Sequence, residues 1–239
     1  MNTAGQPGLG TAGPGPAPAG FDLDMTLIDS RRVILASFAA VSAATGVPID
    51  PDAVDSRLGI KLEDELAFWF PAGEVPSAVR LYREHYLRLA GPLTTALPGA
   101  REALAAVRAA GAPAVVITAK HEVSARVSLD FARLAPDGLY ASVHGPEKAA
   151  VLRAIGAAVY VGDTPADMAA AVQAGSRAVG VTTGSFTERD LRAAGAGTVL
   201  ASLTEFPALF ASLLRLLFVT HRRRIVTEST RRVVRIAKF

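Results

Sequence analysis

From Gly99 onward, short apolar runs alternate with segments of helical pattern, and this alternation constrains the fold more than any other feature of the chain. Short apolar runs separated by helices, with Gly or Pro at their ends, are typical of a parallel sheet covered on both faces. We predict helices at 100–110, 122–134, 147–155, 166–174, 188–194 and 205–214, and strands at 114–118, 139–143, 157–161, 178–182 and 199–200. The sequence therefore predicts an α/β fold.

Residues 31–92 show no strand pattern and consist of helical segments separated by Pro and Gly signals. Ser30 is a suitable cap for the first of these helices, whose apolar residues recur at the spacing of one buried face. Helices are predicted at 31–45, 52–58, 62–70 and 75–90. We therefore expect an all-helical insert at 31–92, with the α/β core formed by 21–30 and 93–214.

The two ends of the chain differ from this body. Residues 1–20 are dominated by Gly, Ala and Pro and are predicted to be disordered, because they cannot bury apolar surface. Residues 211–239 carry seven Arg and one Lys against one Glu, whereas the whole chain has a net charge of only +3. The basic tail at 215–239 could attract nucleic acid or anionic lipid. A disordered segment or a weak surface helix is the simpler interpretation, so no nucleic-acid partner is expected.

Composition also bears on the location of the protein. The chain has no cysteine, which excludes disulfides, thiolate metal sites and a cysteine nucleophile. Its first residues lack the basic and apolar regions of a secretory signal. The most apolar late stretch, residues 206–219, is short for a bilayer span and contains Arg215. We predict a cytoplasmic protein without a membrane partner.

Residues that can carry chemistry stand just after the apolar runs. Asp22 and Asp24 belong to the segment FDLDMTLIDS, Thr118 ends VVIT and Asp163 follows VYVG. Lys148 lies at a loop-to-helix junction between the last two. Ligands of parallel sheets bind outside the carboxyl ends of the strands. We therefore expect three carboxylates, one ammonium and one hydroxyl to meet at one rim of the sheet.

This set of residues suits phosphoryl transfer. Asp22 and Asp24 are two residues apart on an extended segment and can point to the same side. One carboxylate can attack phosphorus while the other handles the proton of the leaving group. Asp22 and Asp163 offer the oxygen ligands that Mg²⁺ prefers. Lys148 would add a positive charge and Thr118 a hydroxyl donor for the phosphate.

The segments FDLDMTLIDS, VVITAK, HGPEK and VGDTPAD, in this order, resemble the four motifs of the haloacid dehalogenase-like phosphatase superfamily. The resemblance spans residues 21–214. It implies a Rossmann-like core with an inserted helical cap, most like that of phosphoglycolate phosphatase-type members. It also implies Mg²⁺-dependent hydrolysis of a small phosphate monoester, such as a phosphoglycolate-like compound or a sugar phosphate, through an aspartyl-phosphate.

The resemblance implies a role for each matching residue. Asp22 would be the nucleophile and Asp24 the general acid and base, while Thr118 and Lys148 would bind the transferring phosphoryl group. The magnesium ligands would be Asp22, Asp24 and Asp163. Asp167 would be an outer carboxylate that supports either the metal or Lys148. Arg57 and Lys61 are candidates for cap residues that set specificity. Lys120 is interpreted as a surface residue that could contact substrate.

Several alternatives stay open at this stage. Asp167 also fits a helix-capping position, because Thr164, Pro165 and Asp167 stand at the spacing of a cap, a first turn and an acidic third residue. Arg57 and Lys61 could simply be solvated loop cations. Lys61 also suggests an alternative activity, the cleavage of a phosphonate through an imine between this lysine and the substrate. Asp24 argues against this activity and also against haloacid dehalogenase activity.

At the level of the whole protein, a phosphomutase is the nearest alternative, because it differs only in whether the phosphoryl group passes to water or to a sugar hydroxyl. A non-catalytic binding module whose basic tail engages nucleic acid is a more distant one. The sequence gives no oligomeric state.

Two features depart from the family pattern. Pro16 and Pro18 stand where apolar residues of a buried central strand are expected, and proline cannot donate to a central ladder. The first strand must therefore be short, distorted or supported mainly by Phe21 and Leu23. Met25 occupies a position where many relatives have glycine, which predicts a restricted turn.

Overall fold

A computed structural model describes residues 16–215 of the chain. Its main sheet has six strands in the order β5-β4-β1-β6-β7-β8, and every neighbouring pair is parallel. The strands are β1 Ala19–Phe21, β4 Ala114–Ile117, β5 Gly138–Tyr140, β6 Val159–Gly162, β7 Arg177–Val181 and β8 Thr198–Leu200. The predicted parallel sheet is confirmed.

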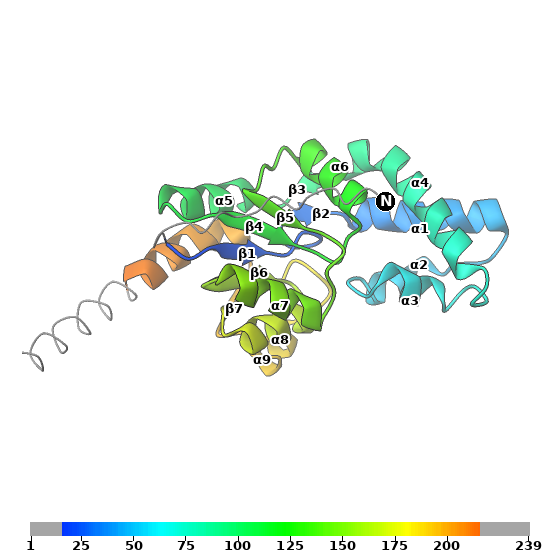
Figure 1. Cartoon of the computed structure of the whole chain (residues 1–239). Helices are drawn as coiled ribbons and strands as arrows, with labels where there is room; N and C mark the ends of the chain where they lie inside the picture. Colours follow the sequence, from blue (N-terminus) through cyan, green and yellow to red (C-terminus); the bar gives the residue numbers. More distant parts are fainter. Residues whose placement is uncertain (1–15, 216–239) are drawn as a thin grey trace, which may run out of the picture.

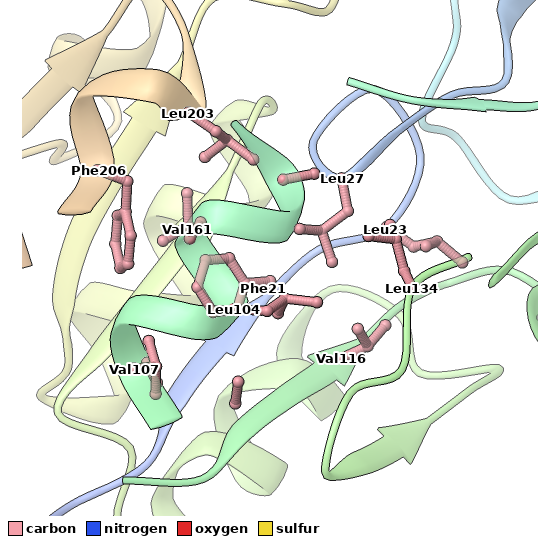
Figure 2. Close-up of a cluster of buried hydrophobic side chains, with 14 of the residues drawn as sticks. Phe21, Leu23, Leu27, Leu104, Val107, Val116, Leu134, Val161, Leu203 and Phe206 are labelled. Atoms are coloured by element: carbon pink, nitrogen blue, oxygen red, sulfur yellow. The ribbon is translucent and has the colours of Figure 1, made fainter. Parts of the chain in front are cut away.

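Helices cover both faces of this sheet, as Figure 1 shows. The helices of the α/β part are α5 Ala100–Ala109, α6 Glu122–Ala132, α7 Pro146–Ile155, α8 Pro165–Ala174 and α9 Glu188–Ala193, followed by the short 3-10 helix η1 Leu203–Glu205 and by helical residues 206–215. Because side chains alternate along a strand, β4 sends Val116 to one hydrophobic cluster and Val115 to the other. Figure 2 shows the first cluster, in which Phe21 meets Phe206 edge to face.

The prolines before β1 do not disturb the sheet, because the strand is only three residues long and begins after them. The carbonyl of Pro18 accepts a hydrogen bond of 2.9 Å from the Ala158 N–H, so the segment still contributes an acceptor. Ala19 and Gly20 belong to β1 and pair with both neighbouring strands. The predicted disorder of residues 1–20 is therefore wrong for this pair, and residues 1–15 lie outside the described part.

Gly20 allows this central strand to pack closely. A Cβ atom at position 20 would lie 2.9 Å from the ring of Tyr160 and 3.2 Å from a methyl group of Leu152. Such a contact is too short for carbon atoms, so the tyrosine ring occupies the space that a side chain would need. The ring of Tyr160 on β6 thus fills the space that apolar side chains of the first strand were expected to fill.

The predicted helical insert is also present, with the helices α1 Arg31–Thr45, α2 Pro51–Ser56, α3 Leu62–Leu66 and α4 Val75–Leu93. It has a hydrophobic cluster of its own, which includes Val33, Leu66 and Tyr86. Two short antiparallel strands, β2 Ile28–Asp29 and β3 Thr95–Ala96, stand where the chain enters and leaves it. Helix α4 extends three residues beyond its predicted end and includes Pro92 in its last turn.

No helix within residues 16–215 combines the length and the apolarity that crossing a membrane would require. Of the basic tail at 215–239, only Arg215 belongs to the described residues, and the interpretation of this tail stays a prediction.

Candidate active site

The residues that follow the central strands meet at one edge of the sheet. Because β1 lies between β4 and β6, Asp22 after β1 has Thr118 on one side and Asp163 on the other. The Asp22 N–H continues the ladder by donating to the Val161 carbonyl at 2.8 Å. The Thr118 N–H does the same on its side with Tyr140, at 2.9 Å. The predicted convergence of these side chains is therefore correct.

Three buried carboxylates gather at this edge. Asp22, Asp163 and Asp167 each place one oxygen within 4.8 Å of the other two. Burial raises the pKa of Asp22 to about 7, although the nearby charge of Lys148 acts in the opposite direction. Burial, together with the charges of Asp22 and Asp167, also raises the pKa of Asp163 well above its usual value. One lysine is thus too little positive charge for three acids, and a divalent cation would supply the rest.

Lys148 joins two of these acids. Its Nζ atom donates to Asp22 Oδ1 and to Asp167 Oδ1, both at 2.7 Å, from the first turn of α7. Burial alone would lower the pKa of Lys148, but the charges of Asp167 and Asp22 outweigh it and hold the pKa well above the usual lysine value. The ammonium therefore stays charged in a position where the α7 dipole disfavours it, as expected of a residue kept for chemistry rather than for helix stability.

Asp167 performs both of the tasks weighed from the sequence. Its Oδ2 atom accepts from the backbone N–H of Thr164 at 3.2 Å and from its hydroxyl at 2.7 Å, which forms a capping box at the start of α8. Its Oδ1 atom accepts from Lys148 and from the Tyr160 hydroxyl at 3.2 Å. A Cβ atom at Gly162 would lie 2.5 Å from that of Asp167, so glycine is required beside it.

Asp163 is held by two residues that the sequence patterns did not reveal. The Thr26 hydroxyl donates to Asp163 Oδ1 at 3.0 Å from the turn after β1. Gly184 lies against the same carboxyl group, because a Cβ atom at this position would stand 2.0 Å from Asp163 Oδ2. Thr26 is part of FDLDMTLIDS and could have been found there. Gly184 carries no signal without the structure, since its role is only to leave space.

Asp24 differs from the other acids in the partner of its carboxylate. Its carboxylate does not belong to the three-acid group but forms an ion pair of 2.8 Å with Lys120 Nζ. Asp167 is thus the third acid of the group, and the predicted role of Asp24 as a metal ligand stays a prediction. The interpretation of Lys120 as a surface residue is wrong, because its side chain is only 8% exposed, whereas its contact with substrate stays a prediction.

Lys120 also contacts the helical insert. Its Nζ atom lies 4.4 Å from the centre of the Tyr86 ring, on α4. Burial lowers the pKa of Lys120, but the negative charge of Asp24 more than compensates and raises this pKa above its usual value. Lys120 thus carries its charge between a carboxylate of the sheet edge and an aromatic face of the insert.

The turn after Asp24 requires an unusual backbone conformation. Met25 has a φ angle of 55°, in the left-handed region that favours glycine, as its departure from the family pattern predicted. Two contacts hold it there: its N–H donates to the Ile28 carbonyl at 2.8 Å, and its carbonyl accepts from the Thr183 hydroxyl. These contacts offset the cost of the conformation and fix the segment that carries Asp24.

The insert and the sheet edge enclose a cleft of about 720 Å³, lined by Asp22, Lys148 and Asp163 on one side and by the 57–65 segment on the other. Gly59 lies close to the core, since a Cβ atom there would stand 3.1 Å from a methyl group of Thr164. Arg57 is engaged by the insert itself, because Glu65 accepts from its Nε and Nη2 atoms at 2.8 and 2.7 Å. Lys61 is exposed and is therefore better placed than Arg57 to contact a substrate in the cleft.

Comparisons with known proteins agree with this geometry. A family model described as haloacid dehalogenase-like hydrolase matches residues 19–171, and a second one, HAD-hydrolase-like, matches 145–206. A protein of Dickeya dadantii named "Probable phosphatase IndB" is 30% identical over 82% of this chain and 94% of its own. A phosphoglycolate phosphatase of Caulobacter vibrioides is 28% identical over 83% and 92%.

Solved structures show the same fold. A haloacid dehalogenase-like family hydrolase from Streptococcus pneumoniae superimposes with a TM-score of 0.71 at 24% identity, covering 81% of this chain and 98% of its own. The parallel sheet, the acidic edge and these matches define a hydrolase. The chain belongs to the haloacid dehalogenase-like hydrolase family, and its phosphatase relatives make it a phosphatase of that family.

Proposed function

We propose that this phosphatase hydrolyses a small phosphate monoester in a Mg²⁺-dependent reaction through an aspartyl-phosphate on Asp22. The observation that carries the proposal is the buried acidic group, in which Asp22, Asp163 and Asp167 stand within 4.8 Å of one another with Lys148 bonded to two of them. A nucleophile, a positive charge for the phosphate and oxygen ligands for a cation are thus present in one cleft.

The donor set fits a hard divalent cation. Asp167 uses both of its oxygens in hydrogen bonds to Lys148, Tyr160 and Thr164, which leaves Asp22 and Asp163 as the residues that would hold the ion. A bound Mg²⁺ would neutralise phosphate oxygens so that a carboxylate can approach an anionic substrate. Asp167 would act indirectly, by fixing the direction of the Lys148 ammonium.

In the first half of the reaction, a carboxylate oxygen of Asp22 attacks phosphorus in line with the departing oxygen. The bond between phosphorus and the ester oxygen breaks, and Asp24 in its protonated form gives the leaving alkoxide a proton. Lys148 and the Thr118 hydroxyl bind the phosphoryl oxygens, whose charge rises during the transfer. Thr118 is buried directly after β4, the neighbour of β1, and lines the same cleft as Asp22.

In the second half, water replaces the ester oxygen. Asp24, now a carboxylate, takes a proton from this water as its oxygen bonds to phosphorus, and the bond to Asp22 breaks to release inorganic phosphate. A phosphomutase would instead deliver the phosphoryl group to a sugar hydroxyl.

A phosphate-release screen over small phosphorylated metabolites, with and without Mg²⁺, tests the proposal. Substrate consumed as an isomerised sugar phosphate without phosphate release would assign the mutase activity instead.

Binding of Mg²⁺ should raise the melting temperature more at high pH than at low pH. Because burial raises the Asp22 pKa to about 7, protons compete with the cation below that value. At about 100 times its Kd the ion adds about 2.7 kcal/mol, or roughly 5–10 °C for a domain of this size. Calorimetry of the wild-type protein and of Asp163→Asn, in which the shift should disappear, checks this.

The metal-free protein should show the opposite pH trend. A carboxyl group whose pKa is higher in the folded state binds more protons when folded, so folding stability falls as pH rises from the unfolded value near 4 to about 7. A metal-free protein whose stability rises across this range, or a Mg²⁺ shift retained in Asp163→Asn, would contradict the assigned cation site.

Lys61→Ala tests the contribution of the cap to substrate choice. Arg57 is paired with Glu65, whereas no ion pair within residues 16–215 engages Lys61, so an anionic leaving group would meet Lys61 first. We expect KM for phosphoglycolate to rise about two- to fivefold, the range of an exposed charge pair, and KM for a neutral sugar phosphate to stay unchanged. An equal change of KM for both substrates would show that Lys61 does not distinguish the leaving groups.

A further inference from the structure

Lys120 lies in the cleft but has no part in the proposed reaction. Its Nζ atom is 2.8 Å from Asp24 Oδ1 and 4.4 Å from the centre of the Tyr86 ring, with 8% of the side chain exposed. The short loop after β4 brings it there, and its own N–H is bonded to the Thr118 hydroxyl at 3.1 Å. The ammonium therefore stands between the sheet edge and the helical insert.

The Asp24 side chain would be poorly held without this lysine. Asp24 follows a three-residue strand, is a quarter exposed, and lies next to the left-handed Met25. Among the described residues, its one ion pair is with Lys120. By contrast, Asp163 is fixed by Thr26, and Asp167 by its capping box and Tyr160.

Tyr86 connects the lysine to the position of the insert. It is almost fully buried on α4, packs near Tyr82 within the cluster of the insert, and its hydroxyl shares a hydrogen bond of 2.8 Å with Ser128 on α6. A cation over an aromatic face is attracted by the electrons of the ring. If α4 moved away from α6, Lys120 would lose the ring and keep only Asp24.

We propose that Lys120 is a positioning residue for Asp24, which it holds for the water-activating half of the reaction when Tyr86 of the insert lies over it. This inference rests on the proposed function and deepens it. In this half, the water oxygen bonds to phosphorus, the phosphorus–Asp22 bond breaks, and the water proton passes to Asp24. An ion-paired carboxylate is the form of Asp24 that this step requires, and the insert thereby controls the hydrolysis of the aspartyl-phosphate.

Pre-steady-state kinetics with nitrophenyl phosphate test the proposal. Nitrophenolate leaves without a proton, so transfer of the phosphoryl group to Asp22 does not need Asp24, whereas its hydrolysis does. In Lys120→Met we expect a burst of about one nitrophenolate per enzyme and a steady-state kcat lowered roughly 10- to 100-fold, within the contribution of a general base. KM in Lys120→Met should change only as far as the slower hydrolysis step alters it. Lys120→Arg should restore most of the hydrolysis rate.

The Tyr86 variants separate the ring from its hydroxyl. Tyr86→Leu removes the aromatic face and should also produce a burst, whereas Tyr86→Phe keeps the face and should behave like the wild type in this assay. Melting temperatures identify any variant that fails to fold, in which case the conservative variants Lys120→Arg and Tyr86→Phe are compared instead. An unchanged hydrolysis rate in Lys120→Arg supports the role of the cation. A burst in Tyr86→Phe contradicts the role of the ring.

Two failures of this experiment are distinguishable. If the wild-type protein releases no nitrophenolate in a Mg²⁺- and Asp22-dependent way, the proposed function fails. If the wild type is active but Lys120→Met shows no burst and only a higher KM, Lys120 binds substrate and the inference is overturned.

Discussion

Asp22→Asn is expected to abolish turnover while leaving the fold intact. The amide cannot form the bond to phosphorus, so we expect kcat to fall by roughly 10⁴- to 10⁶-fold, as when a nucleophile is removed from another hydrolase. The fold should persist because the side chain stands at the end of β1 and removal of a buried charge with a raised pKa relieves repulsion. Steady-state phosphate release and circular dichroism measure the two effects.

The matched control for this substitution is Asp130→Asn. Asp130 is an exposed residue of α6, and the same change there should alter kcat less than twofold. Activity near the wild-type level in Asp22→Asn would refute the assigned nucleophile. An equal loss in Asp130→Asn would attribute the effect to folding instead.

Lys148→Met should cause the largest loss of stability. Removing one partner of a buried ion pair costs about 3–5 kcal/mol, because the remaining charge stays buried without compensation. Here two carboxylates, Asp22 and Asp167, would lose their shared partner. Urea unfolding of the metal-free protein at pH well above 7 should show this loss. Well below pH 7 the loss should shrink, since Asp22 is then protonated.

Lys61→Met is the control for that measurement, because Lys61 is exposed and the change should stay within about 0.5 kcal/mol. A double variant that combines Lys148→Met with Asp167→Asn should recover part of the lost stability. If Lys148→Met were as stable as the wild type at high pH, the lysine would not compensate the acidic group, and the account of its raised pKa would be wrong.

The strands of the parallel sheet and the place of the acidic residues could be predicted because both depend on local patterns. Apolar runs bounded by glycine and proline mark the strands, and the topology of a parallel sheet brings their carboxyl ends together. Asp22, Asp163 and Lys148 could therefore be placed from the sequence, and Asp167 could be given both of its roles. The helical insert was equally predictable, since helical periodicity persists through 31–45 and 75–90.

The errors arise where long-range contacts decide. The ion pair of Asp24 was not predicted, because its partner Lys120 is 96 positions further along the chain and carries no spacing signal. Lys120 was taken as a surface residue because lysine usually is one. The pairing of Arg57 with Glu65 on the next helix was not predicted, and a role of Arg57 in specificity stays a prediction. Gly20 and Gly184 matter only through the neighbours that fill their space.

Covalent phosphorylation of Asp22 tests the central claim most directly. The wild-type protein, mixed with substrate and Mg²⁺ and quenched in acid during turnover, should carry one hydroxylamine-labile phosphoryl group on the peptide that contains Asp22. Asp22→Asn treated in the same way should carry none. Phosphate release without any adduct, or an adduct on a peptide from elsewhere in the chain, would contradict the mechanism.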